Sequence, residues 1–175
     1  MAIYFKTKLV KLEQRWARSC ILGCPDLPRN YLTKVADEEI FIAQFNLEDI
    51  SRKINNIYLP HRGMLYFFYD IERQTPIVRY QENIIYNEKD FSRVDFNDIP
   101  DVSYQLNKEY NISFIEKESP CFLLKEDENL KPGEIILLRL ASLSKKNNGE
   151  IFDFIAFKDD LLNCDYSKIR LEIKR

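Results

Sequence analysis

The stretch that decides the fold is Glu39-Ile-Phe-Ile-Ala-Gln-Phe-Asn46, which is apolar on both sides of an extended chain. A short apolar run of this kind is typical of a β-strand that is buried on both faces. A second stretch, Glu134-Ile-Ile-Leu-Leu-Arg-Leu140, has the same character. We therefore expect both stretches to form central strands of β-sheets.

The composition favours β-structure in a single domain over residues 1–175. Hydrophobic residues make up 45% of the chain and charged residues 31%, which is an ordinary globular balance. The aromatic share of 13% suits the half-buried, pleated surfaces of sheets. A chain of this length can also build a hydrophobic core without a metal or a disulfide.

The charge pattern disfavours two classes of partner. Lys and Arg number 26 and Asp and Glu number 28, so the net charge is −2 and gives no reason to expect nucleic acid. No run approaches the roughly 18 apolar residues that a membrane helix needs, and we expect the first residues not to act as a signal peptide. We expect a cytoplasmic protein without cofactor or metal, whose cysteines are free thiols.

Further strands are expected on either side of the two central ones, at residues 64–69, 77–80, 112–116, 121–124, 151–155 and 169–173.

Helices are expected to be few and short. Residues 47–54 favour one or two helical turns with Asn46 as the N-cap, and residues 100–110 favour a second short helix. Residues 7–20 leave a strand and a helix as open alternatives, because both periodicities are present. The prolines within residues 23–30 predict an irregular or extended turn.

The chain contains a degenerate internal duplication. Three pairs of blocks occur in the same order, namely 40–45 with 135–140, 63–69 with 149–155, and 90–96 with 165–171. We infer two β-repeats, at about 39–96 and about 134–173, that pair as roll- or sandwich-like antiparallel sheets and so cover each other's edges and apolar faces. Gly63 and Gly149 are expected to hold positive φ before a strand of each repeat.

Several of these blocks resemble the YwqG-like family, a bacterial family of unknown function. Ser19-Cys-Ile-Leu-Gly-Cys-Pro-Asp-Leu-Pro28 resembles its opening Ser-x-Leu-Gly-Gly-x-Pro-x-Leu-Pro motif, and residues 41–47 resemble its Leu-Ala-Gln-Ile-Asn-Leu strand. Residues 59–70 resemble its Leu-Pro-x-x-Gly-x-Leu-x-Phe-Phe-Tyr-Asp block, and residues 149–169 resemble its closing motif. The resemblance implies a mainly β, roll-like fold.

The resemblance supplies no catalytic residues, and the chain departs from the family pattern in two places. Leu22 replaces the first Gly of the opening motif, and the stretch with proline and tryptophan that usually follows the motif is missing. A binding surface formed by that stretch would therefore be altered here.

Gln44 and Arg139 are the first candidates for a ligand site, because they occupy equivalent positions in the two repeats. Strand alternation would place them on one face with Ile40/Ile42 and with Ile135/Leu137, respectively. There they could reach a cleft between the repeats and bind a carboxylate or a carbonyl group. The alternative is that they only satisfy the hydrogen bonds of a loop.

Asp70 and Asp153 are the second pair of candidates. Asp153 stands where the first repeat has Phe67, and Asp70 closes the first aromatic strand. Two carboxylates indicate acid–base chemistry only if they converge. Otherwise Asp153 is expected to face solvent on a partly exposed strand. The aromatic run at residues 66–69 is expected to pack in the core rather than to stack on nucleic-acid bases.

The cysteines and the single histidine give a weaker signal. Cys24 and His61 could form a nucleophile and base pair, although no third group in the sequence would orient the ring. The spacing of the four cysteines satisfies only half of a zinc-site pattern, so we expect buried thiols that act as small hydrophobic side chains. We predict neither a catalytic residue nor a metal site.

These observations favour a non-catalytic binding or protein-interaction module, whose partner is an unknown protein or small molecule. An immunity-type protein that neutralises a toxin is one version of this hypothesis. The alternatives are a small hydrolase or transferase that depends on Cys24 and His61, and a structural subunit that pairs through an exposed sheet edge.

Overall fold

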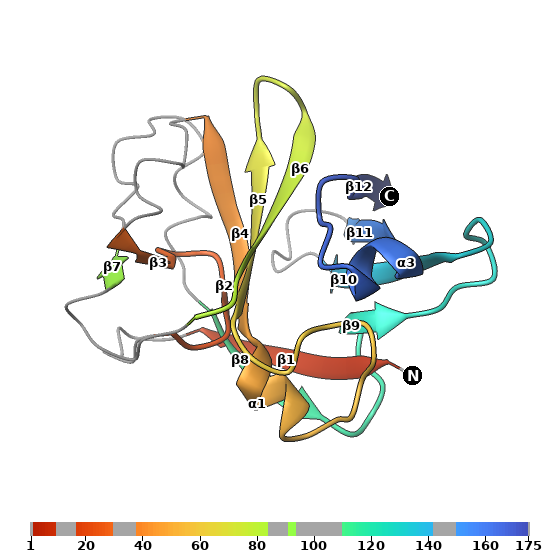
Figure 1. Ribbon diagram of the computed structural model, residues 1–175, viewed down its shortest axis with the longest axis horizontal. Coiled ribbons are helices and arrows are strands. Elements are labelled where there is room, and N and C mark those ends of the chain that lie inside the picture. The colour runs from red at the N-terminus through yellow and green to blue at the C-terminus, as the bar shows by residue number, and fades with distance from the viewer. Residues whose placement is uncertain are drawn as a thin grey trace.

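The computed structural model describes residues 2–9, 17–29, 38–83, 91–93, 110–141 and 150–174. It is mainly β, with 51% strand and 9% helix, and its described residues form two antiparallel sheets and two short helices (Figure 1). This confirms the predicted fold class. No helix within the described ranges is both long and apolar enough to cross a membrane.

Ten strands form one antiparallel sheet in the order β12-β11-β10-β9-β1-β8-β2-β4-β5-β6. Their bounds are β1 (Ile3–Leu9), β2 (Cys20–Ile21), β4 (Glu39–Asn46), β5 (Met64–Asp70), β6 (Thr75–Gln81), β8 (Tyr110–Ile115), β9 (Cys121–Lys125), β10 (Glu134–Ala141), β11 (Ile151–Phe157) and β12 (Arg170–Lys174). The small second sheet pairs β3 (Asp26–Pro28) with β7 (Phe91–Arg93), and the helices are α1 (Leu47–Ser51) and α3 (Lys158–Leu162).

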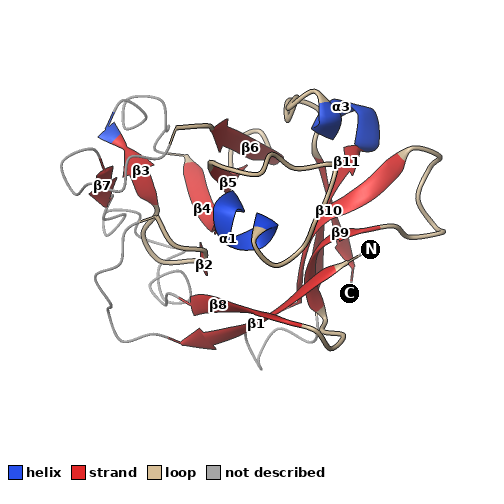
Figure 2. Cartoon of the chain, turned by 60° about the horizontal axis from the view of Figure 1, so that its bottom comes forward, coloured by secondary structure: helices blue, strands red, loops and turns tan. Residues whose placement is uncertain are grey.

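The large sheet is rolled, so that its first and last strands approach each other. Figure 2 shows β4, β5 and β6 on one side and β9, β10 and β11 on the other, with β1 and β8 joining them below. The outermost strands, β6 and β12, contact each other, but no hydrogen-bonded ladder joins them. The ring of Tyr80 in β6 also lies 6.1 Å from that of Tyr166, in the segment that leads into β12. We call the region of Tyr80, Tyr166 and Cys164 the seam.

A column of phenylalanines fills the inside of the roll. Phe5, Phe45, Phe67 and Phe154 are each at most 1% exposed. Successive rings meet edge to face, with centroids 5.7, 5.8 and 5.2 Å apart. Each such pair contributes about 0.5–1.5 kcal/mol beyond the burial of its area. The column therefore joins β1, β4, β5 and β11, which come from distant parts of the sequence.

The central strands are also buried on their outer faces, which explains why they are apolar on both sides. Phe41, Tyr66 and Phe68 belong to a cluster outside β4 and β5, and Ile136 and Ile155 belong to another outside β10 and β11. Tyr66 and Phe68 are fully buried, as the prediction of core packing for this aromatic run requires.

The units β4–β5–β6 and β10–β11–β12 share two features. The first strand of each has a register shift, between Phe41 and Ala43 in β4 and between Ile136 and Leu138 in β10. Each of these strands also begins with a buried glutamate that pairs with an arginine of the third strand. The pairs are Glu39 with Arg79 at 2.5 Å and Glu134 with Arg170 at 2.8 Å.

The third pair of predicted blocks occupies different surroundings in the two halves of the chain. The described part of the block at 90–96 forms β7, which pairs with β3 in the small sheet. The block at 165–171 runs into β12, which pairs with β11 in the large sheet. In the large sheet, β6 lies next to β5 as β12 lies next to β11.

The short helices and the N-terminal segment were predicted in part. α1 is confirmed, and the Asn46 side chain caps it by accepting from the backbone N–H groups of Glu48 and Asp49. The strand alternative holds for β1 and β2 within residues 7–20, whereas residues 10–16 lie outside the described ranges. The helix expected at 100–110 also lies there, except for Tyr110, which begins β8. α3 was not predicted.

Gly63 has the positive φ that was predicted, at +102°, whereas Gly149 lies outside the described residues. A Cβ at position 63 would lie 2.5 Å from the carbonyl oxygen of Gln81. At Gly133, where φ is +85°, the nearest atom to an added Cβ is 3.9 Å away, on Phe157. A side chain at position 63 would meet both backbone strain and a steric clash, whereas a side chain at position 133 would meet backbone strain alone.

We expect Gly63→Ala to lower the free energy of unfolding by about 3 kcal/mol, because strained backbone and a steric clash add together. Gly133→Ala, with the backbone strain alone, should cost about 1 kcal/mol. Urea unfolding of both variants measures the difference. Equal losses would show that the close approach to Gln81 does not restrict position 63.

Candidate functional site

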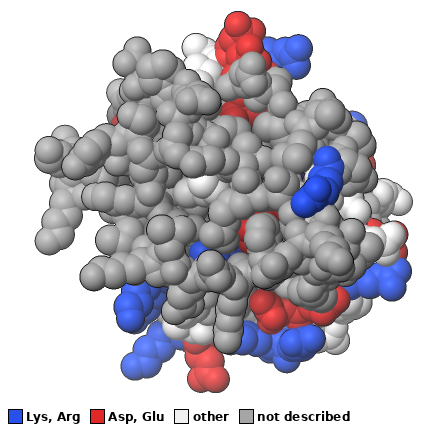
Figure 3. Space-filling view, turned by 90° about the vertical axis from the view of Figure 1, so that its left-hand side faces the viewer, with Lys and Arg blue, Asp and Glu red and all other residues white. Residues whose placement is uncertain are grey.

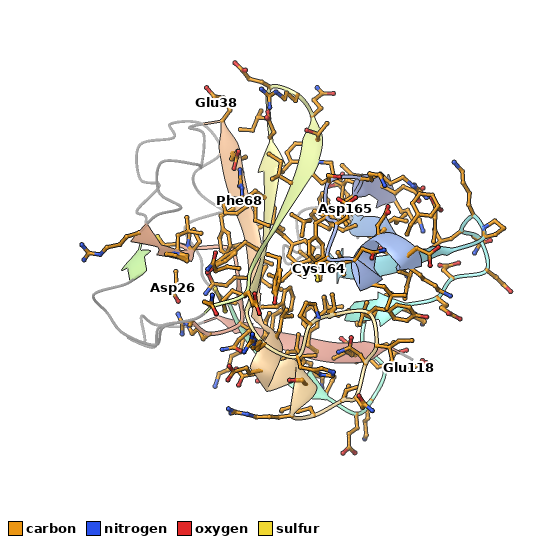
Figure 4. All side chains as sticks on the ribbon, viewed as in Figure 1. Asp26, Glu38, Phe68, Glu118, Cys164 and Asp165 are labelled. Atoms are coloured by element: carbon orange, nitrogen blue, oxygen red, sulfur yellow. The ribbon has the colours of Figure 1, made fainter. Side chains whose placement is uncertain are left out.

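Gln44 is fully buried, and its amide is occupied by protein partners. Its Oε1 accepts from the backbone N–H of Asp26 at 2.8 Å, and its Nε2 donates to the carbonyl oxygen of Arg18 at 2.7 Å and to Asp26 Oδ2 at 3.1 Å. The Tyr66 hydroxyl donates to the Asp26 carbonyl oxygen at 2.8 Å. These bonds fasten the opening-motif segment beside β4, where Figure 4 labels Asp26.

Asn46 adds to the same attachment. Its backbone N–H donates to Ser19 Oγ at 2.9 Å, and its side-chain Nδ2 donates to the carbonyl oxygen of Ala17 at 2.8 Å. The same side chain caps α1, so one residue orders both the helix start and the opening segment. The geometry thus gives Gln44 and Asn46 hydrogen bonds that hold a loop.

Arg139 and Asp153 are paired across β10 and β11 and form a bidentate ion pair. Arg139 Nε donates to Asp153 Oδ1 at 2.5 Å, and Nη2 donates to Oδ2 at 2.6 Å. Lys174 Nζ lies 2.9 Å from Asp153 Oδ2, and the Arg139 guanidinium stacks 4.9 Å from the centre of the Phe122 ring. The hydrogen bond to Asp153 raises the pKa of Arg139.

The expectation that Asp153 faces solvent is wrong. Its side chain is fully buried, which two cationic partners make tolerable.

The bulges correct two further expectations. An extra residue in β4 and in β10 reverses the alternation of side chains beyond it. Gln44 therefore lies opposite Tyr66 and Arg139 lies opposite Asp153, so Asp153 corresponds to Tyr66 and not to Phe67.

The bulges also change which apolar residues share a face with the two candidates. Ile135 and Leu137 pack inside the roll, whereas Arg139 stacks on Phe122 of the outer cluster. Gln44 likewise contacts the segment outside β4, and Ile42 packs toward the inside. The two candidates consequently point to separate outer faces of the roll.

Asp70 lies at the start of the β5–β6 turn and is 5% exposed. Its Oδ1 accepts from the backbone N–H of Arg73 at 2.8 Å, which stabilises the turn. Asp153 has Arg139 and Lys174 as partners instead, so the two carboxylates do not meet at a common group.

The four cysteines are free thiols in different environments. Cys20 and Cys121 are buried, Cys24 is half-buried, and Cys164 is exposed, so the expectation of a buried thiol is wrong for Cys164. Burial raises the pKa of the Cys121 thiol.

His61 is exposed, and no described residue forms a hydrogen bond or ion pair with its ring. In the described ranges, no three His, Cys, Asp or Glu side chains are placed to hold a metal ion.

The seam contains a polar group that the described residues leave unsatisfied. Tyr166 is 7% exposed, and its buried hydroxyl has no hydrogen-bond partner within the described ranges. Its ring lies 6.1 Å from that of Tyr80, whose hydroxyl donates to the carbonyl oxygen of Arg62 at 3.2 Å. Cys164 precedes Tyr166 by two residues, and Figure 4 shows it beside the end of α3, on the side of β6.

Electrostatics keep both phenols of the seam protonated. Burial raises the pKa of Tyr166, and Cys164 and Tyr80 raise it further. Burial also raises the pKa of Tyr80, with added contributions from Glu82 and Cys164. At neutral pH the two side chains are therefore hydrogen-bond donors, and neither is a base or a nucleophile.

Two exposed apolar side chains lie in the segment of sequence that contains Cys164 and Tyr166, and a third lies in the segment before β5. Leu162 and Ile173, on the second unit, are 52% and 51% exposed. Ile57 is 71% exposed and precedes Tyr58, whose ring lies 6.0 Å from Lys158 Nζ of α3. The surrounding charges are paired, as Arg62 with Glu82, Lys158 with Glu126, and Lys168 with Asp160.

The described charges are of both signs on another face of the molecule. On the side shown in Figure 3, the described Lys and Arg side chains alternate with Asp and Glu side chains around its margin. No patch of a single sign is visible in the described part of this view.

We expect Asp153→Ala to lower the free energy of unfolding by about 3 kcal/mol, because it leaves Arg139 without its buried partner. The double variant Arg139→Met/Asp153→Ala should recover most of this loss. Lys168→Gln, which removes two surface ion pairs, is the control and should leave stability nearly unchanged. Chemical unfolding measures the stability of all three variants. Equal losses of stability in Asp153→Ala and Lys168→Gln would contradict the view that Asp153 is a stabilising buried partner of Arg139.

No curated protein matches the chain at a significant level. A family model described as a domain of unknown function, DUF1963, matches residues 19–134. The match includes the opening motif, β4, β5, β6 and the strands that follow as far as the start of β10. The chain therefore belongs to the DUF1963 family, whose function is unknown.

Proposed function

We propose that the chain is a non-catalytic protein-interaction module that binds its partner at the seam. The observation that carries the proposal is the buried, unpaired hydroxyl of Tyr166. Leaving a buried donor unsatisfied costs about 1–3 kcal/mol, and such groups in folded proteins call for an explanation. An acceptor supplied by a partner, such as a backbone carbonyl group, would satisfy this hydroxyl.

The surroundings of the seam favour a protein as the partner. Leu162, two residues before Cys164, is 52% exposed, and the half-buried ring of Tyr80 packs against that of Tyr166. Tyrosine is among the residues that dominate binding energy at protein interfaces, and paired charges are typical of an interface rim. An exposed leucine and a tyrosine ring in the same region are better suited to a protein segment than to a strongly charged ligand.

The arrangement gives less support to the alternative of a hydrolase or transferase. A nucleophilic Cys24 would need His61 held in place by a third group. The His61 ring is exposed and has no such partner among the described residues. The protonated phenols of the seam can donate hydrogen bonds but cannot take up a proton.

We also propose that the chain arose by internal duplication, that it is a YwqG-like protein, and that it is cytoplasmic. The shared bulges and the shared Glu–Arg pairs support the view that β4–β6 and β10–β12 derive from one repeated unit. The motifs support assignment to the YwqG-like proteins, and the free thiols fit a reducing cytoplasm. An immunity-type protein that binds a toxin is one form of such a module.

The test compares Tyr166→Phe with the parent chain. Removing an unpaired buried hydroxyl should leave the stability unchanged or raise it by about 1 kcal/mol. The same change should reduce partner capture at least tenfold, because the donor is lost. Affinity capture from the native cells, followed by quantitative mass spectrometry, measures partner binding. Tyr4→Phe, which removes an exposed hydroxyl bonded to Glu118, is the matched control.

Two outcomes would contradict the proposal. The first is a Tyr166→Phe bait that captures the same proteins in the same amounts as the parent. The second is a loss of more than about 2 kcal/mol in the free energy of unfolding, which would show that the hydroxyl has an internal partner.

A further inference from the structure

β12 ends the large sheet, and β11 is its one hydrogen-bonded neighbour among the described strands. None of its five residues is buried. At the other end of the sheet, β6 contains Pro76, which has no N–H group to donate to a neighbouring strand. β6 and β12 contact each other, and Figure 1 shows β12 leading away from β6 toward the C-terminus. The available edge of the sheet is therefore the second half of β12.

Ile173 gives this edge an exposed apolar side chain. It lies opposite Phe152 of β11, which packs against the core inside the roll, as does Leu171. Strand alternation places Ile173 on the same inner face as Leu171. Ile173 is nevertheless 51% exposed, and no described strand lies beyond β12. A further strand at this edge would continue the inner face and cover Ile173.

The charged side chains of β12 alternate in sign on the opposite, outer face. Arg170 pairs with Glu134 and Glu172, and Lys174 pairs with Asp153. Arg170, Glu172 and Lys174 each keep between 38% and 42% of their side-chain surface exposed. They can therefore form further ion pairs with a strand that adds to the edge.

We propose that this strand is β12 of a second copy of the chain, so that two rolls join through one continuous antiparallel sheet. When a two-fold axis perpendicular to the sheet relates two antiparallel strands, one residue lies opposite itself. With Ile173 at this position, its side chain covers its own copy. Glu172 of each copy then lies opposite Lys174 of the other, and both charge pairs are favourable.

The charges of β12 disfavour the other registers. A pairing centred on Glu172 would place two glutamates opposite each other and Arg170 opposite Lys174. A pairing centred on Leu171 would place Lys168 opposite Lys174 and would use the part of β12 nearest β6. The sequence of this edge therefore selects the register centred on Ile173.

This inference does not rest on the proposed partner site, and it is tested on the purified chain alone. A five-residue edge strand gives a small interface, so we expect a reversible dimer whose amount depends on concentration. Failure of self-association would therefore leave the proposed interaction at the seam untouched.

Disulfide crosslinking reads the register directly. All variants carry Cys164→Ser, because Cys164 is exposed. Residues opposite each other in an antiparallel pair have Cα atoms about 4.5–5.5 Å apart, which a disulfide spans. Ile173→Cys should therefore form a covalent dimer under mild oxidation. Leu171→Cys, which would lie roughly 14 Å along the strand from its copy, should crosslink about tenfold more slowly or not at all. Ile57→Cys, at a 71% exposed position, is the control for random collision.

Sedimentation equilibrium measures the dimer without a crosslink. We expect Ile173→Asp to raise the dimer Kd about tenfold or more, because it places two carboxylates opposite each other. Ile57→Asp makes the same change at another exposed isoleucine and should match the parent. Glu172→Lys should also weaken the dimer about tenfold, whereas Glu128→Lys, in an exposed loop, should not. Urea unfolding shows whether each variant is folded.

Three results would overturn the inference. The first is a parent chain that stays monomeric at about 1 mM. The second is crosslinking of Leu171→Cys or Ile57→Cys at the rate of Ile173→Cys. The third is a dimer that Ile173→Asp and Ile57→Asp weaken equally, which would place the contact between copies elsewhere.

Discussion

The packing of one aromatic column inside a rolled sheet is the constraint on which the rest of the structure depends. Phe5, Phe45, Phe67 and Phe154 come from four strands far apart in the sequence and meet edge to face. To bury them together, the ten-stranded sheet must bring its two end strands into contact. The roll closes by side-chain packing at this point and not by a hydrogen-bonded ladder, and this is the origin of the seam.

The polar groups of the core show why the seam is distinctive. Arg139 is matched by Asp153, and Gln44 by Asp26, so these buried polar groups stabilise the fold. Tyr166 is buried to a similar degree and has no such match among the described residues. A group that the fold leaves unsatisfied is a better indication of binding than one that the fold already uses.

Much of the fold could be predicted from local sequence, because strands buried on both faces have a characteristic apolar pattern. The central strands, the Asn46 cap and the positive φ of Gly63 follow from such local rules. The bulges in β4 and β10 could not be predicted, since an added residue leaves no compositional mark. Those bulges place Gln44 and Arg139 on separate outer faces, where Asp26 and Asp153 bond their polar groups.

The seam could not be predicted from sequence either. Tyr166 and Tyr80 are 86 positions apart, and only the rolled sheet brings their rings together. In the sequence, Tyr166 is one aromatic residue of a repeated block, and nothing local indicates a buried hydroxyl without an acceptor. Long-range packing decides which polar groups remain unsatisfied, and a single sequence does not contain that information in readable form.

The central claim is that a partner protein occupies the seam, and site-specific photo-crosslinking in the native cell tests it most directly. A crosslinking amino acid at Leu162, beside the seam, is compared with one at Ile71, which is exposed in the β5–β6 turn. The account predicts a discrete crosslinked species from position 162 that disappears in Tyr166→Phe, and none from position 71. Equal crosslinking from the two positions, or a species at position 162 that persists in Tyr166→Phe, would contradict it.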